Sequence, residues 1–290
     1  MSDRIVSGKT RLCGVIGDPI EHTMSPAIHN AAFAQMGLDY LYVPFHVKKE
    51  ELGKAIDGMR ALNMRGLNVT IPHKVTIIPL LDELDPLAGK IGAVNTVTND
   101  DGVLKGSNTD ASGFLQALLE RGIEPEGKRI VILGAGGASR AISFILAERG
   151  AYLVILNRLL ERAEELASWL STIFNMEVKA LELVEENLAQ VLDEADILVN
   201  ATSVGMSPNI NETPVPSHLL RPGLIVFDIV YNPIKTRLLR EAEEVGAEPI
   251  SGVDMFVWQG ALAFERWTGV KAPLELMQAE VIKQLQTYEK

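Results

Sequence analysis

The feature that most constrains the fold is a glycine-rich loop that directly follows a compact apolar run. Arg129–Leu133 form the run, and Gly134-Ala135-Gly136-Gly137-Ala138 leads from it into a helical pattern that ends at Arg149. The first glycine suits a tight turn after a strand, and the second lets the backbone approach a pyrophosphate closely. The N–H groups of the following helix then face the anion. The pattern predicts a Rossmann-type dinucleotide-binding unit; a glycine-rich turn with only a packing role is the alternative.

The end of the next predicted strand indicates which dinucleotide is bound. About 20 residues after such a loop, NAD sites usually place an Asp or Glu that holds the ribose hydroxyls. This chain has Asn157 and Arg158 there, and Arg162 follows, in position to share a helix face with Arg158. A guanidinium binds a 2′-phosphate that a carboxylate would repel. We therefore predict NADP as the cofactor; two solvated arginines on a helix surface are the alternative.

Elsewhere, β-branched runs alternate with amphipathic helical segments, which predicts parallel α/β sheets. Strands are expected at Leu12–Ile16, Tyr40–Phe45, Leu67–Val69, Arg129–Leu133, Tyr152–Leu156, Ile197–Asn200 and Ile225–Ile229. Helices are expected at 26–36, 50–62, 74–81, 111–121, 138–149, 160–174 and 253–268, with another after Pro273. A nucleotide-binding series of alternating strands and helices begins near Asp110 and ends near Gly252. The last two helices follow no strand of their own, so we expect them to return to the first domain.

These patterns predict an α/β protein of two domains. Residues 1–109 plus 253–290 would form a discontinuous α/β substrate-binding domain, and residues 110–252 a Rossmann-type, doubly wound NADP-binding domain.

Charge and cysteine content limit the partners. The net charge of −11 argues against a nucleic-acid surface, which needs clustered Lys and Arg. The single cysteine, Cys13, cannot form an internal disulfide, and no Cys/His cluster has zinc spacing, so no metal is predicted. No apolar signal segment or membrane-length stretch is present, so we expect a cytoplasmic protein that binds no membrane. A monomer and a homodimer both remain open.

Three polar clusters in the first domain are candidates for a substrate site. Thr23 and Ser25 alternate in an extended segment before a helix N-terminus, which suits a carboxylate. An N-cap role for Ser25, with Pro26 as the first helical residue, is the alternative. Lys74 closes a polar run that follows a short buried strand, where α/β sheets place ligands. It could carry a proton or bind a hydroxyl, or be a surface lysine.

A third cluster joins Asn95 and Thr96 with residues 106–110. Asp110 falls at the predicted domain boundary, where clefts form. Its alternative role is the N-cap of the helix that begins at Ala111.

Taken together, these motifs resemble the shikimate dehydrogenases, within the wider shikimate/quinate dehydrogenase family. The resemblance runs nearly end to end. Its motifs are Gly17-Asp18-Pro19-Ile20 with Ser25-Pro26, Asn68-Val69-Thr70-Ile71-Pro72-His73-Lys74, Gly92-Ala93-Val94-Asn95-Thr96, Asn108-Thr109-Asp110, Gly134 to Ala138, Asn157-Arg158, Asn200-Ala201-Thr202-Ser203 with Gly205-Met206, Asp228 with Tyr231, and Gly252 to Gln259.

The resemblance implies NADP-dependent, reversible hydride transfer that reduces 3-dehydroshikimate to shikimate, in aromatic amino-acid (chorismate) biosynthesis. It implies that Lys74 and Asp110 are the catalytic pair. Lys74 would protonate the ketone oxygen during reduction. Asp110 would hold the neighbouring ring hydroxyls and orient the ammonium group.

The resemblance also implies the binding residues. Thr23 and Ser25 would grip the substrate carboxylate, Asn95 and Gln259 would bind ring hydroxyls, and Thr70 and Tyr231 would line the pocket. The implied cofactor residues are Gly134, Ala135, Gly136, Gly137, Ala138, Asn157, Arg158, Arg162, Thr202, Ser203, Met206 and Gly252.

Two positions depart from the common family pattern. Leu159 stands where Thr is frequent, which removes one possible phosphate contact. Thr23 stands where Ser is common and adds a methyl group beside C1 of the substrate. Quinate carries an extra hydroxyl at C1, and an apolar pocket cannot strongly reject an added hydroxyl. A quinate-preferring or dual-specificity dehydrogenase is therefore the alternative within the family. A redox-inactive NADP sensor is the alternative from another class, although it would not need both Lys74 and Asp110.

Overall fold

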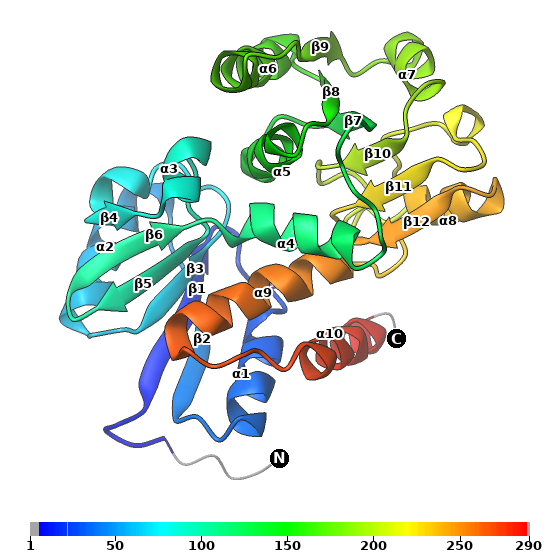
Figure 1. The fold of residues 1–290 in the computed structure, drawn as a ribbon. Coiled ribbons are helices and arrows are strands. Elements are labelled where there is room, and N and C mark those ends of the chain that lie inside the picture. Colours follow the sequence, from blue (N-terminus) through cyan, green and yellow to red (C-terminus); the bar gives the residue numbers. More distant parts are fainter. Residues whose placement is uncertain (1–5, 22, 289–290) are drawn as a thin grey trace. The chain divides into compact units, whose positions relative to one another are not determined.

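The structure is a computed structural model that describes residues 6–21 and 23–288. The chain divides into two compact units. The first takes the residues up to Thr109 together with Val257–Thr287, and the second takes Asp110–Phe256. Each unit is built on its own six-stranded sheet, and the two sheets are visible in Figure 1. Within the described residues, no helix is both long enough and apolar enough to cross a membrane.

The sheet of the first unit is mixed, in the order β2-β1-β3-β5-β6-β4. Its strands are β1 (Arg11–Gly17), β2 (Tyr40–His46), β3 (Gly66–Val69), β4 (Glu83–Leu84), β5 (Thr96–Asp100) and β6 (Val103–Ser107). β1 is parallel to β2 and β3, whereas β5 is antiparallel to both β3 and β6.

The prediction of a purely parallel sheet is therefore wrong for this unit. The cause is a tight hairpin between β5 and β6, whose turn residues Asp101 and Gly102 have φ angles of 52° and 94°. An Asp-Gly pair adopts such left-handed angles readily and favours a two-residue hairpin. This pair was the sequence signal for the antiparallel strands.

The helical segments of the first unit follow the strands closely. They are α1 (Ser25–Gln35), η1 (Lys49–Glu51), α2 (Leu52–Ala61), η2 (Ile78–Leu80) and α3 (Pro86–Ile91), with α10 (Leu274–Tyr288) and the part of α9 (Gly252–Thr268) from Val257 onward. The helix predicted over 74–81 is wrong, because this segment forms turns and then the short η2. The Lys74 carbonyl accepts a hydrogen bond from Val94 N–H (2.7 Å) across the unit, rather than from the next helical turn. Pro79 also lacks an N–H donor.

The C-terminal segment completes the core of the first unit. Trp267 of α9 is 1% exposed, and its Nε1 donates to the Val97 carbonyl at 3.0 Å. The indole lies so close to Gly66 that a Cβ there would come within 2.0 Å of Nε1. Arg65 Nε donates to the Trp267 carbonyl at 2.7 Å and so binds the end of α9. Residues far apart in the sequence therefore share one hydrophobic interior.

The second unit has an entirely parallel sheet in the order β12-β11-β10-β7-β8-β9. Its strands are β7 (Arg129–Leu133), β8 (Tyr152–Asn157), β9 (Lys179–Glu182), β10 (Ile197–Asn200), β11 (Ile225–Asp228) and β12 (Glu248–Ser251). Its helical segments are α4 (Thr109–Leu119), α5 (Gly137–Glu148), α6 (Leu160–Phe174), α7 (Glu185–Leu192), η3 (Ser217–Leu219) and α8 (Arg237–Glu244), with the first turns of α9. Two α/β domains, one of them with a Rossmann-type sheet, confirm the predicted fold class.

Candidate active site

In the first unit, the ends of β1 and β3 meet tightly and bring two predicted substrate segments together. A Cβ on Gly17, the last residue of β1, would lie 2.4 Å from Thr70 Cγ2. Just beyond, Asp18 N–H donates to the Ile71 carbonyl at 2.9 Å. Only glycine allows this close approach. Thr70 therefore lies beside the turn that leads toward Thr23.

Ser25 is not an N-cap, so that alternative is wrong. α1 begins at Ser25 itself, its N-cap is Met24, and Pro26 is the second helical residue. The Ser25 side chain is 7% exposed. Thr23 is half-buried, and its Oγ1 accepts a hydrogen bond from Ser25 N–H at 3.3 Å. The two hydroxyls are thus held together at the start of a helix, where partial positive charge favours an anion.

Lys74 is half-buried in the turn that follows β3. The preceding residue, His73, is completely buried, and its Nε2 lies 2.7 Å from the Val47 carbonyl. Because a carbonyl oxygen only accepts, Nε2 carries the proton. Together with the bond from Val94 N–H to the Lys74 carbonyl, this contact fixes the backbone on both sides of the lysine.

Asn95 is 2% exposed and anchors the start of α4. Its Oδ1 accepts from Thr109 N–H at 2.7 Å, and its Nδ2 donates to Thr109 Oγ1 at 2.9 Å. Asp110, the second residue of α4, is 5% exposed and lies inside the first helical turn, so the N-cap alternative for it is wrong. Gln259, the last predicted substrate ligand of the first unit, is a half-buried residue of α9.

Two further residues of the candidate clusters have no individual role predicted from the sequence. Asn68 is 6% exposed and Thr96 is completely buried. Asn68 Nδ2 donates to the Asn95 carbonyl (3.3 Å) and to Thr96 Oγ1 (3.1 Å). The signal was present, since polar residues inside short apolar strands need buried partners. The identity of those partners depends on the tertiary fold.

In the second unit, the glycine loop has the predicted form. Gly134 has a φ of 102°, which L-residues with a side chain rarely adopt, and its carbonyl accepts from Ser139 Oγ at 2.6 Å. Gly136 is the N-cap of α5, and no side chain of the described residues caps the helix there. A Cβ on Gly136 would meet no atom within 4 Å. The N-terminus of α5 is therefore open around Gly136, and the first N–H groups of a helix are the kind of donor that binds a pyrophosphate.

The residues after β8 are exposed and carry no carboxylate up to Leu160. β8 ends at Asn157, whose Nδ2 donates to the Leu159 carbonyl at 2.9 Å. Arg158 and Arg162 both have exposed side chains. Since α6 begins at Leu160, Arg158 precedes the helix, and the two arginines do not share a helical face as predicted. Both remain available to a 2′-phosphate.

The remaining predicted residues of this unit follow β10, β11 and β12. Ser203 and Met206 are exposed in the loop after β10. Tyr231 stacks on Phe256 with ring centroids 4.3 Å apart, and burial raises the pKa of Tyr231 to about 12. Gly252 opens α9 so close to β11 that a Cβ would lie 2.4 Å from the Ile229 carbonyl oxygen. A larger residue at position 252 would displace this backbone.

The carboxylate of Asp228, the last residue of β11, organises the loop after β10. It is completely buried and accepts hydrogen bonds from Thr236 Oγ1 (2.6 Å), Asn200 Nδ2 (2.9 Å) and Val230 N–H (3.0 Å). Asn200 Oδ1 in turn accepts from the Thr202 hydroxyl (2.6 Å) and Thr202 N–H (3.1 Å). Thr202, a predicted cofactor residue, is thus held in place from the core.

Titration of Asp228 should change the stability of the chain. Burial raises the pKa of Asp228 to about 6, outweighing the three donors that favour the charged form. An unfolded Asp titrates near pH ~4, so between roughly pH 4 and 6 the folded chain binds more protons, and the free energy of unfolding falls as pH rises. Between about pH 4 and 7 we expect the free energy of unfolding of the wild type to fall by about 2–3 kcal/mol relative to that of Asp228→Asn. Urea unfolding of both chains measures this difference; parallel pH curves would contradict it.

Three family models match successive parts of this chain. Residues 15–97 match the family described as "Shikimate dehydrogenase substrate binding domain", residues 117–234 match "Shikimate / quinate 5-dehydrogenase", and residues 252–282 match "Shikimate 5'-dehydrogenase C-terminal domain". A shikimate dehydrogenase (NADP(+)) of Methanopyrus kandleri is 51% identical over 283 residues, which cover 97% of this chain and 98% of the relative.

Two solved structures are similar over nearly their full lengths. Shikimate 5-dehydrogenase from Thermus thermophilus, in complex with NADP(H) and shikimate, has a TM-score of 0.84 at 38% identity and covers 94% of this chain and 99% of that one. Quinate dehydrogenase from Corynebacterium glutamicum, in complex with NAD, has a TM-score of 0.87 at 31% identity, with the same coverage of 94% and 99%. With this fold, this glycine loop and these relatives, the chain belongs to the shikimate dehydrogenase family.

Proposed function

We propose that this chain is an NADP-dependent shikimate dehydrogenase, EC 1.1.1.25, which reduces 3-dehydroshikimate to shikimate in aromatic biosynthesis. The observation that carries the assignment is identity of 51% to a shikimate dehydrogenase (NADP(+)) across 97% of the chain. Each unit has residues that suit one part of this reaction, cofactor binding in the second unit and substrate binding in the first. The second unit offers an open helix N-terminus and exposed arginines, and the first offers paired hydroxyls and a half-buried lysine.

The residues of the second unit fit NADP. The N-terminus of α5 after Gly136 would hold the pyrophosphate. Arg158 and Arg162 would bind the 2′-phosphate, and Asn157 would lie beside them at the end of the strand. The other residues that we assign to the cofactor site are Gly134, Ala135, Gly137, Ala138, Thr202, Ser203, Met206 and Gly252. When bound at this site, NADPH would supply the hydride for C3 of the substrate ring.

Lys74 and Asp110 are the residues that we assign to catalysis. Lys74 Nζ would donate a proton to the oxygen that develops negative charge during reduction, and would take it back in the reverse direction. Asp110 would accept hydrogen bonds from the neighbouring ring hydroxyls and from the lysine ammonium. Both are held by defined backbone contacts, at the turn after β3 and at the start of α4.

The other substrate contacts follow from the same assignment. Ser25 and Thr23 would hold the carboxylate, Asn95 and Gln259 the ring hydroxyls, and Thr70 and Tyr231 the pocket walls. Residues 1–109 plus 253–290 would then form the substrate-binding domain, and residues 110–252 the cofactor-binding domain. The cytoplasmic location and the choice between monomer and homodimer stay predictions from the sequence.

A spectrophotometric assay tests the function directly. The purified chain should form NADPH when it is given NADP with shikimate. The same assay with quinate tests the alternative, a quinate-preferring or dual-specificity dehydrogenase. The methyl group of Thr23 and the similarity to a quinate dehydrogenase are the reasons to test it. A higher kcat/KM for quinate would move the assignment to a quinate dehydrogenase. Turnover of neither compound would reject the enzyme assignment.

A further inference from the structure

Five buried side chains of the first unit form one continuous hydrogen-bond network. Tyr42, Asn68, Asn95, Thr96 and Thr109 are each no more than 6% exposed. The Tyr42 hydroxyl donates to Asn68 Oδ1 at 2.8 Å, and Asn68 Nδ2 donates to Thr96 Oγ1 at 3.1 Å. Thr96 Oγ1 donates to Asn95 Oδ1 at 3.1 Å, and Asn95 Nδ2 donates to Thr109 Oγ1 at 2.9 Å. The network therefore connects β2, β3, β5 and the start of α4.

Two main-chain groups fix the orientation of both amide side chains in this network. The Asn95 carbonyl can only accept, so the Asn68 amide must turn its Nδ2 toward it, at 3.3 Å. Asn68 Oδ1 then faces Tyr42, whose hydroxyl must donate. At the other end, Thr109 N–H can only donate, so it fixes Asn95 Oδ1 as the acceptor, at 2.7 Å. No amide in the network can flip without losing a buried bond.

Tyr42 also contacts Ser25, which is predicted to bind the substrate carboxylate. The side chain of Ser25 hydrogen-bonds the Tyr42 hydroxyl, and burial raises the pKa of that hydroxyl far above its ordinary value, so it stays protonated and able to donate. The Tyr42 ring is stacked on the ring of His29, with centroids 4.4 Å apart and an interplanar angle of 14°. Stacking on His29 therefore fixes the position of the Tyr42 ring, and the hydrogen bonds to Asn68 and Ser25 fix its hydroxyl.

The network joins residues that the proposed function places at two different parts of the substrate. Ser25 is assigned to the carboxylate, Asn95 to a ring hydroxyl, and Thr109 directly precedes Asp110 in α4. We infer that Tyr42 and Thr96 are positioning residues for shikimate, which set the orientation of Ser25, Asn95 and the start of α4 without touching the substrate. This inference rests on the proposed function.

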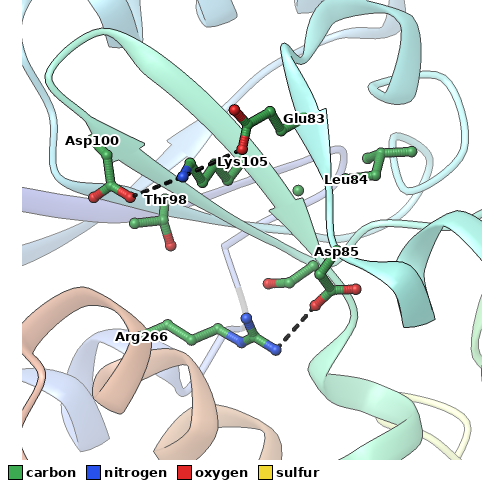
Figure 2. A pocket seen from close by; sticks show the side chains of 9 residues that line it. Glu83, Leu84, Asp85, Thr98, Asp100, Lys105 and Arg266 are labelled. Atoms are coloured by element: carbon green, nitrogen blue, oxygen red, sulfur yellow. Dashed lines mark hydrogen bonds and ion pairs between the residues drawn. The ribbon is translucent and has the colours of Figure 1, made fainter.

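The chain supplies matched controls for both residues. Tyr42→Phe and Thr96→Val remove one network hydroxyl each and keep the side-chain shape. Tyr40→Phe removes a buried tyrosine hydroxyl two residues earlier in β2, one that donates to the Trp267 carbonyl (3.3 Å) and lies outside the network. Thr98→Val removes a threonine hydroxyl two residues after Thr96 in β5. Thr98 lines a separate cavity of about 330 Å³ with Lys105 and Arg266 (Figure 2).

The experiment measures kcat and KM for both substrates, and shikimate affinity by calorimetry, in the wild type and the four variants. Leaving a buried amide unsatisfied costs about 1–3 kcal/mol, so Tyr42→Phe and Thr96→Val should each lower kcat/KM for shikimate about 5- to 150-fold. The KM for NADP should stay within about twofold, because the cofactor residues lie in the other unit. The two controls should keep kcat/KM for shikimate within about threefold of the wild type.

Each outcome decides a separate question. If Tyr42→Phe and Thr96→Val match their controls in kcat/KM and in shikimate affinity, the positioning role is overturned. If all four variants lose activity together with thermal stability, the effect is general destabilisation, and the inference is likewise overturned. If the wild type neither binds nor oxidises shikimate, the proposed function itself fails.

Discussion

Replacing Lys74 by alanine should lower the turnover number for shikimate oxidation by about 10²–10⁴-fold, the contribution typical of a positioned general acid or base. The half-buried lysine lies in a turn that His73 and Val94 hold from either side. Truncating its side chain removes the proposed proton donor while leaving those backbone contacts in place. Steady-state kinetics with NADP and shikimate measures the effect, and the KM for NADP should change little.

Lys74→Arg separates proton transfer from simple charge. The guanidinium keeps the positive charge but holds its proton too firmly to exchange it with the substrate oxygen. We therefore expect this variant to bind shikimate while its turnover stays low. Lys90→Ala, which truncates an exposed lysine of α3, is the control for a general loss of charge. If Lys74→Ala changed turnover by less than about threefold, the lysine would be a binding residue only.

Arg158→Ala should weaken NADP binding by about 10- to 150-fold, since a hydrogen bond to a charged group contributes roughly 1.5–3 kcal/mol. Arg158 is exposed at the end of β8 and precedes α6, so its removal leaves the core of the second unit intact. NAD carries no 2′-phosphate, so its affinity should be nearly unchanged. The ratio of the KM values for NADP and NAD measures the selectivity.

Arg149→Ala is the matched control for this prediction. Arg149 is also an exposed arginine of the second unit, but it is the C-cap of α5, at the other end of that helix from the glycine loop. Its loss should leave both KM values unchanged. An unchanged KM for NADP in Arg158→Asp, where a carboxylate would repel the phosphate, would refute the assignment of Arg158.

The sequence predicts best the short central strands, which are buried on both sides, and one long amphipathic helix. The bounds expected for Arg129–Leu133, Leu160–Phe174 and Ile197–Asn200 are those of β7, α6 and β10. Each strand here is a short apolar run that only a buried parallel sheet explains. In contrast, β9 and β12 at the sheet edges are short and only partly buried, and their mixed composition resembles that of loops.

The candidate site shows a similar division. Residue type and spacing were sufficient to single out Lys74, Asp110 and the glycine loop, because each motif is local. The buried partners of Asn68 and Thr96 could not be predicted, since they come from segments that meet only in the folded sheet. Local pattern also suggested N-cap roles for Ser25 and Asp110, whereas the structure places both inside the first helical turn.

The discontinuity of the first unit has a consequence for the order of events during synthesis. The second unit is built almost entirely from one stretch, Asp110–Phe256, which has been made before Trp267 is added. Until that residue arrives, the surface beside Gly66 that the indole covers in the finished fold stays open. The unit whose strands are made first is therefore the last to be completed, and these apolar strands remain exposed to chaperones or to aggregation for longest.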